Sequence, residues 1–121
     1  MVSNQLPHNH VHSHEAAKLS AQLERTDDFQ TVSQVFKLLS DTSRARIFWL
    51  LCHCEECVIN ISALVQMSSP AVSHHLRQLK ASGLIVSRRE GKEVYYKASD
   101  SEESQLLHRT IEIIMEMTCP K

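Results

Sequence analysis

Apolar residues recur along the chain at spacings that predict a mostly helical protein. From about residue 16 they begin to repeat every three or four positions, as on one face of an α-helix, at Val32, Val35, Phe36 and Leu39. The letters LLSDTS at residues 38–43 then indicate a break followed by a helix N-cap. A second helix is expected over about residues 43–51, with one apolar face formed by Ile47, Leu50 and Leu51.

Two short helices and a β-hairpin are expected next. The first helix covers about residues 59–66, and its expected buried residues are Ile61, Leu64 and Val65. The second covers about residues 69–81, because Ser68-Ser69-Pro70 is a strong start signal and Gly83 a typical stop. Its expected buried residues are Val72, Leu76 and Leu79. Residues 84–97 (LIVSRREGKEVYYK) form two β-rich runs around a glycine turn, which predicts a hairpin.

The last predicted helix, over about residues 101–118, has a wide apolar stripe. Its apolar positions repeat at intervals of seven, in the pairs Leu106/Ile113, Leu107/Ile114 and Thr110/Met117. A terminal helix with so broad an apolar surface requires a partner helix, most simply that of a second copy. The pattern therefore predicts a mainly α protein with a small β-hairpin that forms a homodimer through its terminal helices.

The composition is ordinary for a single soluble domain. The 121 residues are 42% hydrophobic and 22% charged, and no apolar run approaches the roughly 20 residues that cross a bilayer. The first residues do not form an export signal, so we expect a cytoplasmic location and no membrane partner. Residues 1–15 place histidines at alternate positions and are expected to be a flexible arm before a domain over residues 16–121. These histidines are His8, His10, His12 and His14.

The order of two short helices, the second polar on one side, and a basic hairpin is that of a winged helix-turn-helix. The net charge is only −1, but between residues 70 and 97 six basic residues face two acidic ones. Such a helix reads base edges in the major groove of double-stranded DNA, while a basic hairpin contacts phosphates. The residues predicted in or beside the groove are Ser69, Ser73, His74, His75, Arg77 and Gln78, with Arg88, Arg89 and Lys92 on phosphates. A solvent-exposed face and turn without a ligand are the plainer alternative.

Three motifs in this part of the chain resemble those of the ArsR/SmtB family of bacterial metal-responsive repressors. They are SDTSRARI leading into the second helix, AVSHHLRQLKASGLI in the predicted recognition helix, and RREGKEVYY in the hairpin. The resemblance covers about residues 36–100. It implies a homodimeric winged helix-turn-helix repressor that binds operator DNA with two recognition helices and releases it when a metal ion binds.

Three of the four cysteines lie in the hexapeptide CHCEEC, residues 52–57. In a reducing compartment clustered thiols favour metal or redox chemistry over disulfides. Several members of the ArsR/SmtB family sense metal through cysteines at the position of Cys57-Val58, and some add ligands from the N-terminal arm. The resemblance therefore implies a site for Zn²⁺ or another thiophilic ion. Its expected ligands are Cys57, Cys54, Cys52, His10 and His12.

A second family site on the dimer helix is only partly matched. Asp100 and Glu116 stand at ligand positions, but Glu102 and Ile113 replace the two expected histidines. A version rebuilt on His108 and Glu112, one helical turn apart, is a weaker expectation.

Two alternatives to metal sensing remain open. Some relatives sense persulfides or oxidants through a cysteine pair, but Trp49 and Met115 occupy those positions here, which leaves Cys119 with Cys52 or Cys54. A dimeric interaction module that does not bind DNA is an alternative of a different class. An enzyme is not expected, because the chain has no glycine-rich phosphate loop and no recognisable acid–base constellation.

Overall fold

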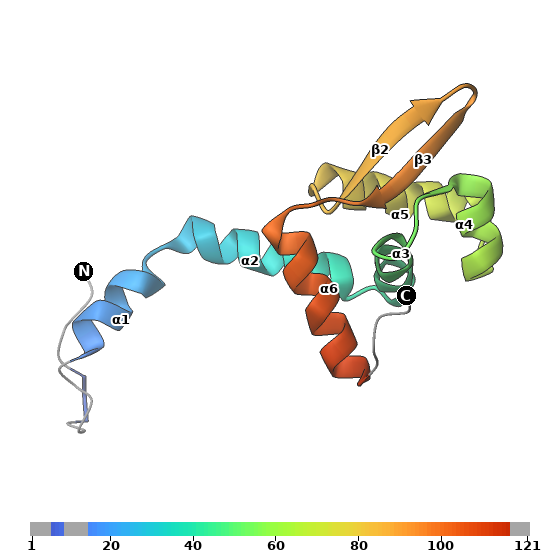
Figure 1. The fold of residues 1–121 in the computed structure, drawn as a ribbon. Coiled ribbons are helices and arrows are strands. Elements are labelled where there is room, and N and C mark those ends of the chain that lie inside the picture. Colours follow the sequence, from blue (N-terminus) through green and yellow to red (C-terminus); the bar gives the residue numbers. More distant parts are fainter. Residues whose placement is uncertain (1–5, 9–14, 117–121) are drawn as a thin grey trace. The chain divides into compact units, whose positions relative to one another are not determined.

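The computed structural model describes residues 6–8 and 15–116 and divides the chain into two compact units, Met1–Val35 and Phe36–Lys121 (Figure 1). Within the first unit lie α1 (Ala16–Leu23) and most of α2, which spans Thr26–Leu39. The single helical stretch expected from residue 16 is thus two helices, separated where the Arg25 amide bonds the Gln22 carbonyl at 3.1 Å. Several large apolar side chains of this unit are solvent-exposed, namely Leu19, Leu23, Phe29 and Val32.

The second unit is built on α3 (Thr42–Leu51), α4 (Val58–Val65) and α5 (Ser69–Ala81). The Asp41 carboxylate caps α3 by accepting a hydrogen bond from the Arg44 amide, and Ser68 Oγ caps α5 by accepting one from the Ala71 amide. The predicted helices are confirmed to within a residue or two. One burial expectation was wrong, because Leu64 is 58% exposed. The side chains that fill the core include Ile47, Phe48, Leu51, Ile61, Leu76, Leu79, Leu84 and Ile85.

The predicted hairpin is present as β2 (Ile85–Glu90) and β3 (Glu93–Ala98). Gly91 begins its two-residue turn with φ +63°, a conformation that favours glycine. A third short strand, β1 (Glu56–Cys57), pairs antiparallel with β3 and places Cys57 opposite Tyr95. The sequence pattern did not predict this strand. It ties the end of the cysteine hexapeptide to the hairpin.

The last helix, α6 (Glu102–Met115), is anchored to the core at its first turn and exposes apolar residues near its end. Ser101 caps it, and the buried Ser104 hydroxyl donates to the Leu84 carbonyl at 2.8 Å. Leu107 packs inward and Ile111 is half-buried, whereas the remaining large apolar residues face solvent. We call the exposed set Leu106, Ile113, Ile114 and Met115 the α6 apolar strip; all four are 59–75% exposed.

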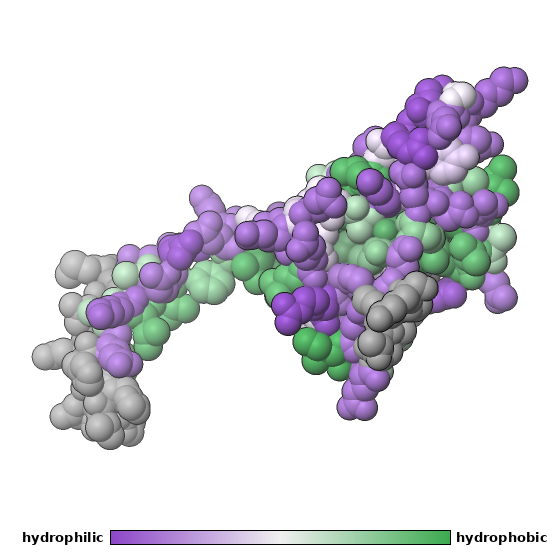
Figure 2. Space-filling model, in the orientation of Figure 1, coloured by the Kyte–Doolittle hydropathy of each residue, from purple (hydrophilic) through white to green (hydrophobic). Residues whose placement is uncertain are grey.

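The architecture confirms the predicted class, mainly helical with a small antiparallel sheet. The face of the hairpin seen in Figure 2 is mostly hydrophilic, whereas apolar side chains reach the surface at the far end of α6. In the described part of the chain no helix combines the length and apolar character needed to span a membrane. Most of the expected arm, including His10 and His12, lies outside the described residues, so the proposed boundary at residue 15 stays a prediction.

Candidate functional site

Helix α5 presents a polar face away from the core. Val72, Leu76 and Leu79 are each at most 1% exposed and fix the inner side of the helix. The outer side carries His74 and Arg77, both exposed. The side chains of Ser69 and Ser73 are half-buried at its margin. This arrangement leaves one side of α5 available to a ligand, as the sequence pattern predicted.

Two of the predicted DNA-contacting residues also take part in the fold. The Arg44 guanidinium donates from Nη1 to Gln78 Oε1 at 2.5 Å and from Nε to the Leu38 carbonyl at 2.8 Å, which ties α5 to the start of α3. His75 is half-buried, and its Nδ1 atom has no hydrogen-bond partner within the described residues. Burial lowers the pKa of His75 below 6.5, although the Asp41 carboxylate opposes this effect. Gln78 and His75 are thus half-buried and partly committed to the fold, whereas the side chains of His74 and Arg77 are exposed to solvent.

Of the exposed cations on the hairpin, Arg88 is paired with carboxylates. Arg88 donates from Nε and Nη2 to the Glu55 carboxylate at 2.9 and 2.8 Å, and from Nη1 to Glu90 at 2.5 Å. Its hydrogen bonds lower the pKa of Glu55 and, together with the Glu90 contact, raise the pKa of Arg88. Arg89 and Lys92 are exposed toward the hairpin tip. Of the three residues predicted on phosphates, Arg88 is therefore already engaged by carboxylates.

The cysteines of the hexapeptide lie in different surroundings. Cys52 and Cys54 are half-buried, and Cys57 is buried in β1. The Cys54 thiol donates to the Leu50 carbonyl at 3.4 Å, and burial raises its pKa, with a further contribution from the Glu56 charge. A raised pKa keeps this sulfur protonated near neutral pH, which disfavours Cys54 as a resting thiolate nucleophile.

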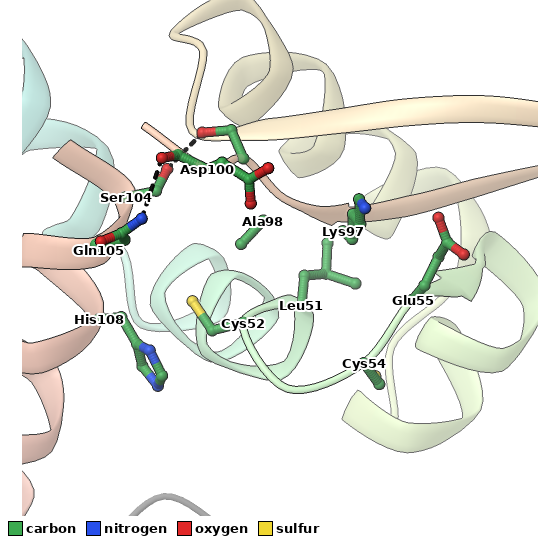
Figure 3. Close-up of a pocket in the computed structure, with 11 residues that line it drawn as sticks. Leu51, Cys52, Cys54, Glu55, Lys97, Ala98, Asp100, Ser104, Gln105 and His108 are labelled. Carbon is green, nitrogen blue, oxygen red and sulfur yellow. Dashed lines mark hydrogen bonds between the residues drawn. The ribbon is translucent and has the colours of Figure 1, made fainter. Parts of the chain in front are cut away.

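A pocket of about 320 Å³ lies between the hexapeptide, the end of β3 and the first turns of α6. In Figure 3 the Cys52 sulfur is on the side of the pocket nearer His108, whereas Cys54 lies toward Glu55. The lining mixes thiol, imidazole, carboxylate and amine groups. Its polar members are Cys52, Cys54, Glu55, Lys97, Ser99, Asp100, Ser104, Gln105 and His108.

Beside this pocket, the chain brings together two imidazoles and a carboxylate. His53 Nε2 is 3.0 Å from His108 Nε2, and Glu112 is 3.4 Å from each of them, through Oε2 to His53 and Oε1 to His108. Within residues 6–8 and 15–116 this is the only set of three or more His, Cys, Asp or Glu ligands lying within 4.8 Å of one another. The sequence pattern singled out His108 and Glu112 but missed His53. His53 lies inside the hexapeptide, yet its distance in the chain from residue 108 gave no sign that the two would meet.

The predicted metal ligands are only partly brought together. The described thiols do not form a group of three ligands, and His10 and His12 lie outside the described residues. Asp100 lines the pocket, and Glu116 follows α6 with φ +53°; neither belongs to the group of His53, His108 and Glu112. These placements leave the thiol site and the site with Asp100 and Glu116 as predictions.

The fold and the polar face of α5 define a winged helix-turn-helix regulator, and comparison with known proteins specifies the family. The sequence pattern of the family described as "Bacterial regulatory protein, arsR family" matches residues 41–87. A transcriptional repressor SmtB homolog from Synechocystis sp. is 31% identical over 106 residues, which cover 88% of this chain and 80% of that protein. The chain therefore belongs to the ArsR/SmtB family of DNA-binding transcriptional regulators, as the sequence motifs predicted.

Two further proteins illustrate the similarity. A cadmium resistance transcriptional regulatory protein CadC homolog from Staphylococcus aureus is 40% identical over 79 residues, 64% of this chain and 65% of that protein. The chain thus spans just under two thirds of the length of this relative. A solution structure from Mycobacterium bovis, described as a homodimeric winged helix-turn-helix DNA-binding domain, has a TM-score of 0.68 and 27% identity. That alignment covers 76% of this chain and 84% of the Mycobacterium bovis chain.

Proposed function

We propose that this protein is a homodimeric repressor that binds operator DNA and releases it when a thiophilic metal ion binds. The observation that carries the DNA-binding part is the geometry of α5. Its inner side is fully buried while His74 and Arg77 remain exposed, and the same unit carries the basic hairpin. Arg77 has the bidentate donor geometry that reads guanine, and Lys92 places a mobile charge suited to phosphates.

Dimerisation is proposed through α6 and the first helices. The α6 apolar strip leaves four large side chains in water, and Leu19 and Leu23 of α1 are 60% and 67% exposed. Exposed apolar surface of this kind marks an association face. The relative from Mycobacterium bovis is described as homodimeric, which supports the same arrangement here.

The inducer is proposed to act on the cysteine hexapeptide, because this segment is fastened to the hairpin at two points. Cys57 pairs with Tyr95 of β3, and Glu55 holds Arg88 of β2. A ligand that moves residues 52–57 would therefore move the hairpin. It would also change the position of Arg88 relative to the DNA phosphates. The relative named for cadmium resistance makes a thiophilic ion, Zn²⁺ or a similar one, the first choice.

The described residues fit this metal only in part. Cys52, Cys54 and Cys57 offer soft sulfur donors, yet they do not form a three-ligand group by themselves. A complete tetrahedral thiol site would therefore take further ligands from the arm, for which His10 and His12 are proposed. When bound, the ion would supply a charge that fixes the segment and displaces thiol protons.

The test begins by selecting tight-binding duplexes from a random-sequence DNA pool with the reduced, full-length protein. Fluorescence anisotropy of the selected duplex then gives affinity with and without Zn²⁺ or Cd²⁺. We expect selective binding that weakens about 5- to 150-fold when metal is added, the range of an allosteric coupling of about 1–3 kcal/mol. A Cys57→Ser variant is expected to bind the duplex normally and to lose this response.

Two results would count against the proposal. If no duplex is enriched, the protein does not recognise operator DNA and acts as an interaction module instead. If the duplex is bound but Zn²⁺ and Cd²⁺ leave its affinity unchanged, the inducer is not a thiophilic metal.

A further inference from the structure

We propose that His53, His108 and Glu112 form a second metal site that contains no sulfur and lies within a single chain. The site would take a borderline divalent ion such as Zn²⁺, Co²⁺ or Ni²⁺, for which imidazole and carboxylate are suitable ligands. None of its ligands stands at the dimer-helix positions considered above, Asp100, Glu102, Ile113 and Glu116. The inference concerns metal binding alone and does not depend on the proposed operator binding.

The distances within the group lie close to the edges of a tetrahedral coordination sphere. A zinc ion about 2.0–2.1 Å from nitrogen and oxygen ligands places those ligands about 3.3–3.4 Å from one another. The separations here are 3.0 Å between the two Nε2 atoms and 3.4 Å from each Nε2 to Glu112. The two 3.4 Å separations involve different oxygens of Glu112, and one ligand atom from each of the three residues lies within 4.8 Å of the other two. Small side-chain rotations, without movement of the backbone, would therefore bring one donor atom of each residue onto a single ion.

Rigid elements hold the ligands in this geometry. His108 and Glu112 are one turn apart on α6, so their side chains lie on the same face. The His53 amide bonds the Leu50 carbonyl at 3.0 Å, which fixes the turn at the end of α3. Trp49 Nε1 donates to Glu112 Oε2 at 3.2 Å and orients the carboxylate, the kind of support that metal ligands ordinarily have.

Burial also favours binding. The three side chains retain 11–20% exposure, so water is mostly excluded while an ion can still enter. Two imidazoles and one carboxylate would leave the site with a net charge of +1 when a divalent ion is bound. The group joins the turn after α3 to α6, and a bound ion would fasten these two elements together.

The experiment uses Co²⁺, because its absorption spectrum distinguishes nitrogen and oxygen ligands from sulfur. A full-length variant is used in which the cysteines are replaced by Ser and the arm histidines by Gln. The replaced cysteines are Cys52, Cys54, Cys57 and Cys119. This thiol-free protein is titrated with Co²⁺. We expect stoichiometric binding with visible ligand-field bands and no near-ultraviolet thiolate-to-cobalt band. The chain has one tryptophan, Trp49, whose ring centroid lies 4.5 Å from that of His53, so Co²⁺ should also quench its fluorescence.

Substitution of the ligands then assigns the site. H53Q and H108Q are each expected to lower Co²⁺ affinity at least tenfold and to abolish the quenching, whereas H74Q, at an exposed position on α5, should change neither. Because a core variant can fail to fold, a second measurement uses the unsubstituted ligands: paramagnetic shifts of the His53 and His108 ring protons on Co²⁺ addition.

Three outcomes would overturn the proposal. One is absence of Co²⁺ binding in the thiol-free background. The others are wild-type affinity in both H53Q and H108Q, or unshifted ring protons, which would show that the group is a hydrogen-bonded network only. A protein that binds Co²⁺ here but no DNA would keep this site and refute the proposed function, so the two failures are distinguishable.

Discussion

Arg77 and Lys92 are both exposed cations, and we expect them to contribute to DNA binding in different ways. Arg77 lies on the outer face of α5, where a guanidinium can donate two hydrogen bonds to one guanine. Arg77→Ala should therefore weaken binding to the selected duplex by about 1–3 kcal/mol and relax the preference at one base pair. Anisotropy measured on the selected duplex and on single-base variants of it tests this expectation.

Lys92 is expected to contact a phosphate rather than a base, so its substitution can be compared with that of Arg77. Lys92→Ala should weaken all duplexes alike and reduce the slope of log affinity against log salt by about 0.9, the value for one lost phosphate contact. Lys18→Ala, at an exposed position of α1, is the charge control. Equal effects of Arg77→Ala on selected and unrelated duplexes would show that Arg77 does not read a base.

His75 is predicted to make stability depend on pH. Its pKa lies below 6.5, chiefly because burial penalises the imidazolium, so the unfolded chain binds this proton more tightly than the folded one. The stabilising contribution is complete above about pH 6.5 and is lost as the pH falls through the window below that value. Urea unfolding between about pH 8 and about pH 5 should show a smaller loss of stability in His75→Leu than in the unsubstituted protein.

A matched variant separates this effect from the other histidines. His74→Leu removes an exposed neighbouring imidazole whose charge is the smallest of the causes that lower the pKa of His75, so it should change the pH dependence less than His75→Leu does. If His74→Leu and His75→Leu change the pH dependence equally, burial of His75 is not its cause.

At the residue scale, local signals predicted the caps and the exposed cations, but not which side chains meet across the fold. Ser68 and Gly83 act within a few residues of their own position, so the pattern identified both ends of α5. The pairing of Arg88 with Glu55 and the meeting of His53 with His108 join residues 33 and 55 positions apart. Nothing in the local pattern encodes such pairs, because they depend on how the helices pack.

At the scale of elements, the first turn of α5 is predicted to control the stability of the helix. Ser68 Oγ accepts from the Ala71 amide at 3.3 Å and satisfies one of the amides left free at a helix start. Ser68→Ala should lower the free energy of unfolding by about 1 kcal/mol, the usual cost of losing such a cap. Urea unfolding at a fixed protein concentration is the appropriate measurement. Ser68→Asn keeps a capping oxygen and should stay within a few tenths of a kcal/mol; an equal loss in both variants would refute the capping role.

The elements themselves followed largely from periodicity, with two instructive exceptions. Strong start and stop signals gave the bounds of α5 and the hairpin. The strand β1 was not predicted, because two residues are too few to show a periodic pattern of apolar positions. Its place is set by pairing with β3. Leu64 was expected in the core of its own unit, yet it lines an apolar groove together with Trp49, Ile111 and Met115. An apolar position on a helix can thus face an association surface as readily as the core.

At the scale of the whole molecule, the α6 apolar strip is predicted to hold the dimer together. Ile113 and Ile114 are 70% and 75% exposed, and covering them with a second copy would remove that surface from water. Ile114→Glu would place a charge in this contact twice, because a two-fold interface repeats every substitution. Burying an unpaired charge costs several kcal/mol, so the dimer dissociation constant should rise at least about a hundredfold. Sedimentation velocity over a concentration series measures this change.

Loss of the dimer should also weaken DNA binding, since two linked recognition helices bind adjacent half-sites far more tightly than one. The selected duplex should therefore be bound by Ile114→Glu only at much higher protein concentration, with α5 and the hairpin unaltered. The matched control is Ile59→Glu, which changes an isoleucine that is 67% exposed on α4, outside the α6 apolar strip. This control should sediment as a dimer. If Ile114→Glu also remains dimeric, α6 does not form the interface, and the exposed residues of α1 and α2 become the surface to test.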